Sequence, residues 1–190
     1  MNLGLETGRA APALIAALRP KAVEARLWAE RTLPKGAPVF AAADGSDDVF
    51  LLLSGLVKLV YTTAEGEDWI KSFILDQGVF SGRGASDAGE SYGAVCLEPC
   101  RFVRLPRGFV QGAVAGDAAL SARYAEFAEW VLARKQAREA ALLTMTPEAR
   151  YLALRAGAPE ALARLPQGDV ARFLGVTPVA FSRIKRRVGT

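Results

Sequence analysis

Between residues 38 and 105 the chain is a succession of short apolar runs separated by turn residues, a spacing typical of a β-sandwich or barrel. The breaks between the runs carry Gly, Asp or Ser, which favour tight turns. In the run 56–63 apolar and polar side chains alternate, so we expect one face of that strand to be exposed to solvent. The runs predicted as strands are 38–42, 49–53, 56–63, 69–75, 92–97 and 100–105.

The character of the sequence changes after Pro106. Residues 117–143 contain neither Gly nor Pro, are rich in Ala, Glu, Arg and Leu, and begin with Asp117, a good N-cap. We therefore expect a helix about 40 Å long. Apolar residues recur in it at the spacing of a coiled-coil seam until Arg134 and Arg138 interrupt the pattern. The seam favours packing on a second copy of the chain, with packing on the chain's own barrel as the alternative, and it consists of Leu120, Tyr124, Phe127 and Val131.

The chain contains no histidine, which excludes Ser-His-Asp and Cys-His catalysis, imidazole zinc sites and His-ligated haem. The adjacent carboxylates Asp47 and Asp48 fit a turn better than an acid and base pair, so we do not expect an enzyme. Two cysteines are too few for a disulfide scaffold or a four-thiolate cluster, and we expect no metal and no cofactor. On one strand Cys96 and Cys100 would lie about 13 Å apart. We interpret them as buried small hydrophobes, the alternative being a redox pair brought together by a bend at Pro99.

The distribution of charge separates the C-terminal part from the rest of the chain. Residues 147–190 hold eight Lys and Arg against three Asp and Glu, whereas the preceding residues hold 16 against 17. A basic module on a nearly neutral body indicates a polyanionic partner. The longest apolar runs are short and the first twenty residues lack the pattern of a secretory signal, so we expect a cytoplasmic protein.

The basic part contains the pattern of a helix-turn-helix. A helix is predicted to start at Thr146 and to end near Gly157, and two short helices follow, separated by a tight turn at Gly175. In the last helix an apolar stripe at i, i+3 and i+7 would pin that helix across the preceding one. The stripe consists of Phe181, Ile184 and Val188.

The opposite side of the last helix is predicted to enter a DNA major groove. Arg183 or Arg186 can contact guanine O6 and N7 in a bidentate manner, and Ser182 can bond a phosphate or a base edge. Lys185, Arg187 and Arg172 would contact phosphates and supply salt-dependent affinity. The alternative is a terminal helical hairpin with a solvated basic face. The candidate DNA-binding residues are Thr177, Val179, Ser182, Arg183, Lys185, Arg186 and Arg187.

The order of these elements resembles that of the Crp/Fnr transcription regulators. VFLLLSGLVKLVYTTAEGEDWIKSFILDQGVF is similar to the β-roll of that family, and GDVARFLGVTPVAFSRIKRR is similar to its DNA-binding element. The resemblance implies an α+β fold with a helical segment and a jelly-roll-like antiparallel β-roll at 1–116, a long dimerisation helix at 117–143 and an all-α helix-turn-helix domain at 144–190. It implies a sequence-specific regulator that binds a pseudo-palindromic operator in double-stranded DNA as a homodimer, with a small-molecule effector and RNA polymerase as further partners.

The expected ligand differs from that of the cyclic-nucleotide-binding members, which carry a Gly-Glu pair followed by Arg-Ser or Arg-Thr. In this chain Gly82 lies near the Glu position and Glu90 near the Arg position, where a carboxylate would repel a phosphate. Cyclic AMP is therefore not expected unless Arg83 takes over. The Gly-rich stretch 77–91 is a candidate for another ligand, with a flexible surface loop as the alternative. Its candidate effector-binding residues are Gly82, Arg83, Gly84, Ser91 and Tyr92.

The last helix also differs from the family pattern Glu-x-x-Ser-Arg. Ser182 and Arg183 match and are carried over as DNA contacts, whereas Val179 replaces the Glu that contacts cytosine and can touch a thymine methyl. Only three residues follow Arg187, so we expect no β-hairpin wing and fewer phosphate contacts. These differences leave an alternative function, a small-molecule-binding β-roll whose C-terminal helices bind protein and do not read DNA.

Overall fold

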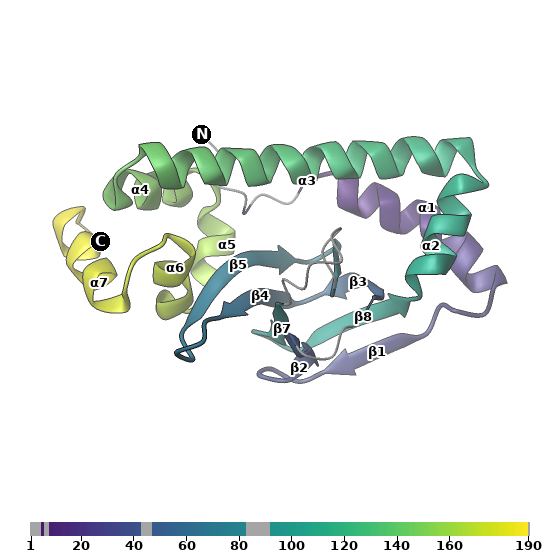
Figure 1. Ribbon diagram of the computed structural model, residues 1–190, viewed down its shortest axis with the longest axis horizontal. Coiled ribbons are helices and arrows are strands. Elements are labelled where there is room, and N and C mark those ends of the chain that lie inside the picture. The colour runs from purple at the N-terminus through teal and green to yellow at the C-terminus, as the bar shows by residue number, and fades with distance from the viewer. Residues whose placement is uncertain (1–4, 6–7, 43–46, 83–91, 190) are drawn as a thin grey trace.

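The computed structural model describes Leu5 and residues 8–42, 47–82 and 92–189. Within these residues the chain forms a β-roll, a long helix and a group of short C-terminal helices (Figure 1). The long helix runs along one side of the roll, and the C-terminal helices lie near its end (Figure 1). This arrangement confirms the α+β fold expected from the sequence.

Two antiparallel sheets make up the roll, each with four strands among the described residues. One sheet has the strand order β1-β8-β3-β6 and the other has the order β2-β7-β4-β5. Six of these strands were predicted; β1 and β6 were not, because β1 is exposed at three of its four positions and β6 lies in the Gly-rich stretch. The strands are β1 (Glu30–Leu33), β2 (Pro38–Phe40), β3 (Val49–Ser54), β4 (Leu56–Thr62), β5 (Asp68–Leu75), β6 (Gly78–Ser81), β7 (Gly93–Cys96) and β8 (Cys100–Leu105).

An aromatic cluster fills the interior of the roll. Phe50 of β3 stacks on Phe80 of β6 with ring centroids 5.2 Å apart, and Phe40 of β2 lies 5.3 Å from Phe50. Because β2 belongs to one sheet and β3 and β6 to the other, these rings join the two sheets. Complete burial of a side chain of this kind contributes about 1.5–3 kcal/mol.

Strand β4 lacks the exposed face that the sequence predicts. Val60 is buried and Lys58 is half-buried, although both lie on the side expected to face solvent. The pairing of β4 with β5 shifts register between Leu59 and Val60, which interrupts the alternation of side chains. The C-terminal helices also cover this side, since Val60 belongs to the same apolar cluster as their buried residues. The prediction of an exposed face is therefore wrong.

The start of the long helix is held against the roll by two shorter helices. Asp117 caps the long helix by accepting a hydrogen bond from the Leu120 N–H (3.0 Å), as the sequence predicts. Lys21 pairs with the same carboxylate at 2.8 Å and lowers the pKa of Asp117. The three helices are α1 (Ala10–Glu24), α2 (Arg107–Ala115) and α3 (Ala118–Thr144).

The C-terminal helices share a hydrophobic core with the roll. Their buried apolar side chains form one cluster with side chains of β4 and β5, and the ring of Phe73 in β5 lies 5.3 Å from that of Phe173. The first of these helices begins as predicted, because Thr146 accepts a hydrogen bond from the Ala149 N–H (3.2 Å). The helices are α4 (Pro147–Gly157), α5 (Pro159–Arg164), α6 (Gln167–Phe173) and α7 (Pro178–Arg187).

Candidate nucleic-acid interface and adjoining cavity

The predicted helix-turn-helix geometry is present as α6, a tight turn and α7. Gly175 has a φ of 73°, a left-handed conformation that favours glycine. Across the turn the Val176 N–H donates to the Ala171 carbonyl (3.0 Å). Thr177 then caps α7 by accepting a hydrogen bond from the Ala180 N–H (3.3 Å). The local sequence therefore fixes where α6 ends and α7 begins.

Helix α7 has one buried face and one exposed face. Phe181 and Ile184 are buried, and the Phe181 ring meets Tyr151 of α4 edge-on at a centroid distance of 5.1 Å. On the other side Val179 is 65% exposed. The apolar stripe thus anchors α7, and the side assigned to DNA is open to solvent. Its other exposed side chains are Ser182, Arg183 and Arg186.

Three of the candidate DNA-binding residues have contacts inside the chain. Thr177 is the N-cap of α7. Arg187 Nη1 donates to Glu148 Oε1 of α4 (2.6 Å), although the Arg187 side chain is largely exposed. Lys185 is half-buried and also interacts within the chain. These contacts help to hold α7 in place. The candidates that are exposed and take no part in such contacts are Val179, Ser182, Arg183 and Arg186.

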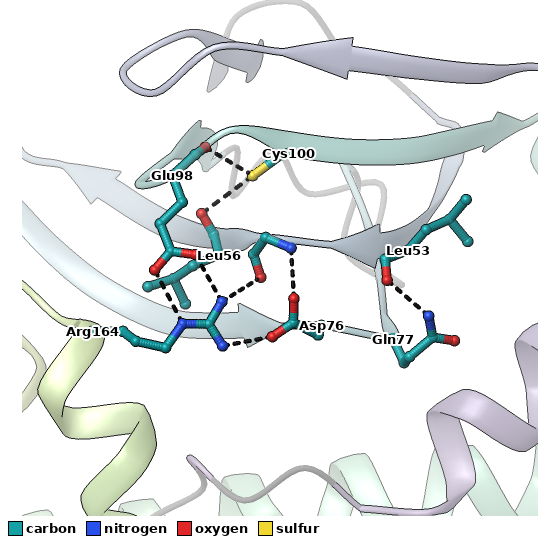
Figure 2. A network of polar contacts seen from close by, with 8 residues as sticks. Leu53, Leu56, Asp76, Gln77, Glu98, Cys100 and Arg164 are labelled. Atoms are coloured by element: carbon teal, nitrogen blue, oxygen red, sulfur yellow. Dashed lines mark hydrogen bonds and ion pairs between the residues drawn. The ribbon is translucent and has the colours of Figure 1, made fainter.

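Arg164, the last residue of α5, joins the C-terminal helices to the roll (Figure 2). Its Nη1 donates to Asp76 Oδ2 (2.5 Å), and its Nε and Nη2 donate to the two carboxylate oxygens of Glu98 (3.0 and 2.7 Å). Nη2 also donates to the Gly55 carbonyl (3.3 Å), and the Gly55 N–H donates to Asp76 Oδ1 (2.7 Å). Only the planar fork of an arginine can reach all of these acceptors at once.

The charges in this network alter the pKa of the groups that take part. Partial burial would raise the pKa of Asp76, but the hydrogen bonds and charge of Arg164, with the Gly55 N–H, outweigh burial and lower it. The same carboxylates raise the pKa of Arg164. A second ion pair, between Lys58 Nζ of β4 and Asp169 Oδ1 of α6, spans 3.1 Å, and both side chains are largely buried.

Two further arginines tie the end of α3 to the C-terminal helices. Arg138 Nη2 donates to the carbonyls of Ile70 in β5 (2.9 Å) and Phe173 in α6 (3.0 Å). Burial lowers the pKa of Arg138 and of Arg150 in α4. Sequence reasoning missed both roles; the signal available for Arg138 was that it interrupts the apolar seam of α3. Arg150 donates to three carbonyls at the ends of α3 and α6, those of Leu142, Met145 and Leu174.

A cavity of about 1260 Å³ lies between α3 and the roll, with walls that include residues of α1, α2, β5 and β6. Among the candidate effector-binding residues, Tyr92 lines this cavity, whereas Gly82 is buried after β6 and does not line it. Arg83, Gly84 and Ser91 lie outside the described residues. Among the described residues, Tyr92 is therefore the candidate effector-binding residue that lies at the cavity.

The four residues of the predicted dimer seam differ in exposure. Leu120 is 2% exposed and packs in a cluster with residues of α1 and β8, and Phe127 is half-buried against the same cluster. Tyr124, which is 43% exposed, and Val131 line the cavity. The chain's own residues cover Leu120, and the dimer seam stays a prediction.

Comparison with known proteins assigns this architecture. Residues 30–117 match the family described as "Cyclic nucleotide-binding domain". This match covers the roll and α2. No curated protein matches the chain in sequence.

Solved structures extend the comparison beyond the cyclic nucleotide-binding domain. FixK2 from Bradyrhizobium japonicum superposes with a TM-score of 0.68 at 19% identity, covering 84% of this chain and 83% of FixK2. CLP, the c-di-GMP-responsive global regulator of Xanthomonas campestris, gives 0.68 at 15% identity, covering 89% and 91%. The Thermus thermophilus catabolite activator protein gives 0.53 at 23% identity, covering 93% and 86%. The chain therefore has the fold of these Crp/Fnr regulators.

The two cysteines of the roll are free and buried. They are not on one strand, because β7 ends at Cys96 and β8 begins at Cys100. Cys100 Sγ donates to the carbonyls of Leu56 (3.4 Å) and Glu98 (3.3 Å) (Figure 2). Burial, together with the nearby Cys100 thiol, raises the pKa of Cys96 to about 12. The chain bends between Cys96 and Cys100, as the sequence allowed at Pro99. The two thiols are buried and form no disulfide.

The described residues form neither a metal site nor a membrane-spanning helix. No three or more His, Cys, Asp or Glu side chains among them are grouped so that they could hold a metal ion. None of the helices formed by these residues combines the length and apolarity needed to cross a membrane.

Proposed function

We propose that the protein is a sequence-specific DNA-binding transcription regulator that reads DNA with α7. The observation that carries this proposal is the outward face of α7, where Ser182, Arg183 and Arg186 are exposed beside Val179 on a helix whose other side is pinned into the core. Arginine is the side chain best suited to bidentate contact with guanine, and serine can bond a phosphate or a base edge. The basic balance of residues 147–190 supplies attraction to phosphates.

We further propose that two copies bind a pseudo-palindromic operator, with α3 as the dimer helix. A two-fold dimer presents two recognition helices, which fit half-sites about 34 Å apart. The side of α3 that remains uncovered in one chain carries Leu132, 56% exposed, and Leu143, 78% exposed. Tyr124 and Val131 of the predicted seam remain candidates for the same contact. In this proposal the protein works in the cytoplasm with RNA polymerase and a small effector other than cyclic AMP.

The proposal is tested by selecting binding sites from a random pool of duplex DNA at low salt. The wild-type protein is compared with the double variant Arg183→Ala, Arg186→Ala, and with Arg31→Ala, which removes an exposed arginine from β1 on the roll. We expect wild type and Arg31→Ala to enrich the same two-fold symmetric motif and the double variant to enrich none. Enrichment of that motif by the double variant, or the same non-specific retention of DNA by all three proteins, would favour C-terminal helices that bind protein and do not read DNA.

A further inference from the structure

The end of α6, immediately before the tight turn, is held by two arginines that belong to other helices. Arg138 of α3 donates through Nη2 to the carbonyl of Phe173 (3.0 Å), and its guanidinium lies 4.5 Å from the centroid of the Phe173 ring. Arg150 of α4 donates through Nη2 to the next carbonyl, that of Leu174 (2.8 Å). The last carbonyls of a helix lack partners within the helix and carry partial negative charge, so cationic donors stabilise this end.

Both arginines also connect the end of α6 to α3. Arg138 is itself a residue of α3, and its Nη2 donates in addition to the Ile70 carbonyl of β5 (2.9 Å). Arg150, which is 7% exposed, donates through Nη1 to the carbonyls of Leu142 (3.2 Å) and Met145 (2.9 Å) at the end of α3. The guanidinium of Arg150 therefore joins the ends of two helices, because it holds carbonyls of α3 and of α6 at the same time.

The turn between α6 and α7 packs closely against these groups. A Cβ atom added at Gly175 would lie 3.3 Å from Leu142 Cδ2 and 3.9 Å from Arg150 Nη2. Across the turn the hydrogen bond from the Val176 N–H to the Ala171 carbonyl ties α7 to α6. A displacement of the end of α6 would therefore carry α7 with it.

We propose that Arg138 and Arg150 are positioning residues that fix the orientation of α7 relative to α3. The inference rests on the proposed function, in which α3 is the dimer helix and α7 reads DNA. In such a dimer, the orientation of α7 on α3 sets the separation of the two recognition helices, and with it the spacing of half-sites that the dimer accepts. Neither arginine contacts DNA in this account, since both act through the carbonyls that they hold.

The first experiment measures the preferred spacing of half-sites. The duplexes carry two copies of the half-site selected by the wild type, separated by spacers that differ in length by single base pairs. We expect Arg138→Gln to lower the preference for the best spacer over the next best about fivefold or more, because a loosened joint accepts several separations. Its affinity for a single half-site should stay within about twofold of wild type, since the base contacts of α7 are intact.

A matched control for this experiment lies on the same helix. Arg123 is an exposed arginine of α3 whose Nη1 pairs with Glu126 of α3 (2.9 Å). Exposed pairs of this kind contribute little to stability. Arg123→Gln is therefore expected to keep the spacer preference of the wild type.

The second experiment measures the orientation of α7 without DNA. Spin labels are attached at Ala133→Cys of α3 and Ser182→Cys of α7, two exposed positions, while the native thiols are buried. Labelled chains are diluted into unlabelled chains, and the distance between the labels is measured by double electron–electron resonance. We expect Arg138→Gln and Arg150→Lys to shift the distance by about 5 Å, one helical turn, or to broaden its distribution about twofold. Arg123→Gln should leave the distribution unchanged.

The two experiments separate this inference from the proposed function. If the wild type selects no DNA motif, the proposed function fails, and the label distances alone decide whether the arginines orient α7. If Arg138→Gln loses the cooperative unfolding transition of the wild type, Arg138→Lys replaces it, because lysine keeps the charge and lacks the planar fork. Label distances that are unchanged in the folded variants of both arginines overturn the proposal. An equal loss of affinity for the single half-site and for every spacer overturns it as well, since that loss reports stability alone.

Discussion

Arg150 lies on α4 and Arg183 on α7, two helices that pack together. The two side chains differ in exposure to solvent. Arg150 is buried and donates to carbonyls at the ends of two helices, whereas Arg183 is exposed on α7. The sequence alone separates them poorly, since both are arginines in short amphipathic helices. Exposure, which depends on how distant segments pack, decides that the first stabilises the fold and the second is free to reach a ligand such as DNA.

Replacing Arg150 with methionine is expected to lower the free energy of unfolding by about 3 kcal/mol, because three buried carbonyls lose a charged donor. Urea unfolding followed by circular dichroism measures the loss. Arg186→Met, at an exposed position of α7, is the control and should change the free energy by less than about 0.5 kcal/mol. Equal effects of the two substitutions would show that the carbonyl contacts of Arg150 are not stabilising.

The cysteines give a second prediction for single residues. Because burial raises the pKa of Cys96 to about 12, almost no thiolate is present at neutral pH. We expect neither Cys96 nor Cys100 to react with a disulfide reagent such as dithionitrobenzoate in the native protein, and both to react within minutes in denaturant. Rapid reaction of either thiol in the native state would support the redox pair instead.

At the scale of helices and strands, sequence patterns predict the features that neighbouring residues determine, such as helix caps and turns. The caps at Asp117, Thr146 and Thr177 mark three helix starts, and six strands follow from apolar runs bounded by turn residues. Strands β1 and β6 escape prediction because β1 is exposed at three of its four positions and β6 lies in the Gly-rich stretch. The covered face of β4 escapes it as well, since Lys58 meets a partner 111 residues away, Asp169. Such a pair is visible only once the chain has folded.

The ion pair between Arg164 and Asp76 leads to a prediction for how the stability of the fold depends on pH. The pKa of Asp76 is lower in the folded chain than in the unfolded chain, so its pairing stabilises the fold above the ordinary carboxyl pKa and is lost as pH falls through the lowered value. The melting temperature of Asp76→Asn should therefore lie below that of wild type at pH 6, and the gap should shrink as pH falls below about 4. A gap that stays constant down to pH 3 would contradict this assignment.

At the scale of the whole molecule, the roll, α3 and the C-terminal helices are joined by shared core and by charge. Arg138 contacts β5 and α6 from α3, and it also lines the cavity. A ligand in the cavity would therefore touch a residue that holds the C-terminal helices. The resemblance between the sequence and a known family predicts the order of these parts, but not that they would meet at this arginine.

The proposed dimer belongs to the same scale. Leu132→Glu and Leu143→Glu place a charge on the uncovered side of α3 and are expected to weaken self-association about tenfold or more, as measured by sedimentation equilibrium. Val23→Glu, at an exposed apolar position of α1, is the matched control and should not change the dimer. Unchanged association in both α3 variants would place the dimer contact elsewhere on the molecule.

The affinity of Arg183→Ala for two duplexes tests most directly whether α7 reads DNA sequence. One duplex carries the motif selected by the wild type and the other carries the same bases scrambled. We predict that Arg183→Ala binds the selected duplex more weakly by about 1–3 kcal/mol and binds the scrambled duplex as wild type does. An equal loss on both duplexes would make Arg183 a phosphate contact, and no loss on either would contradict the account of α7 as the recognition helix.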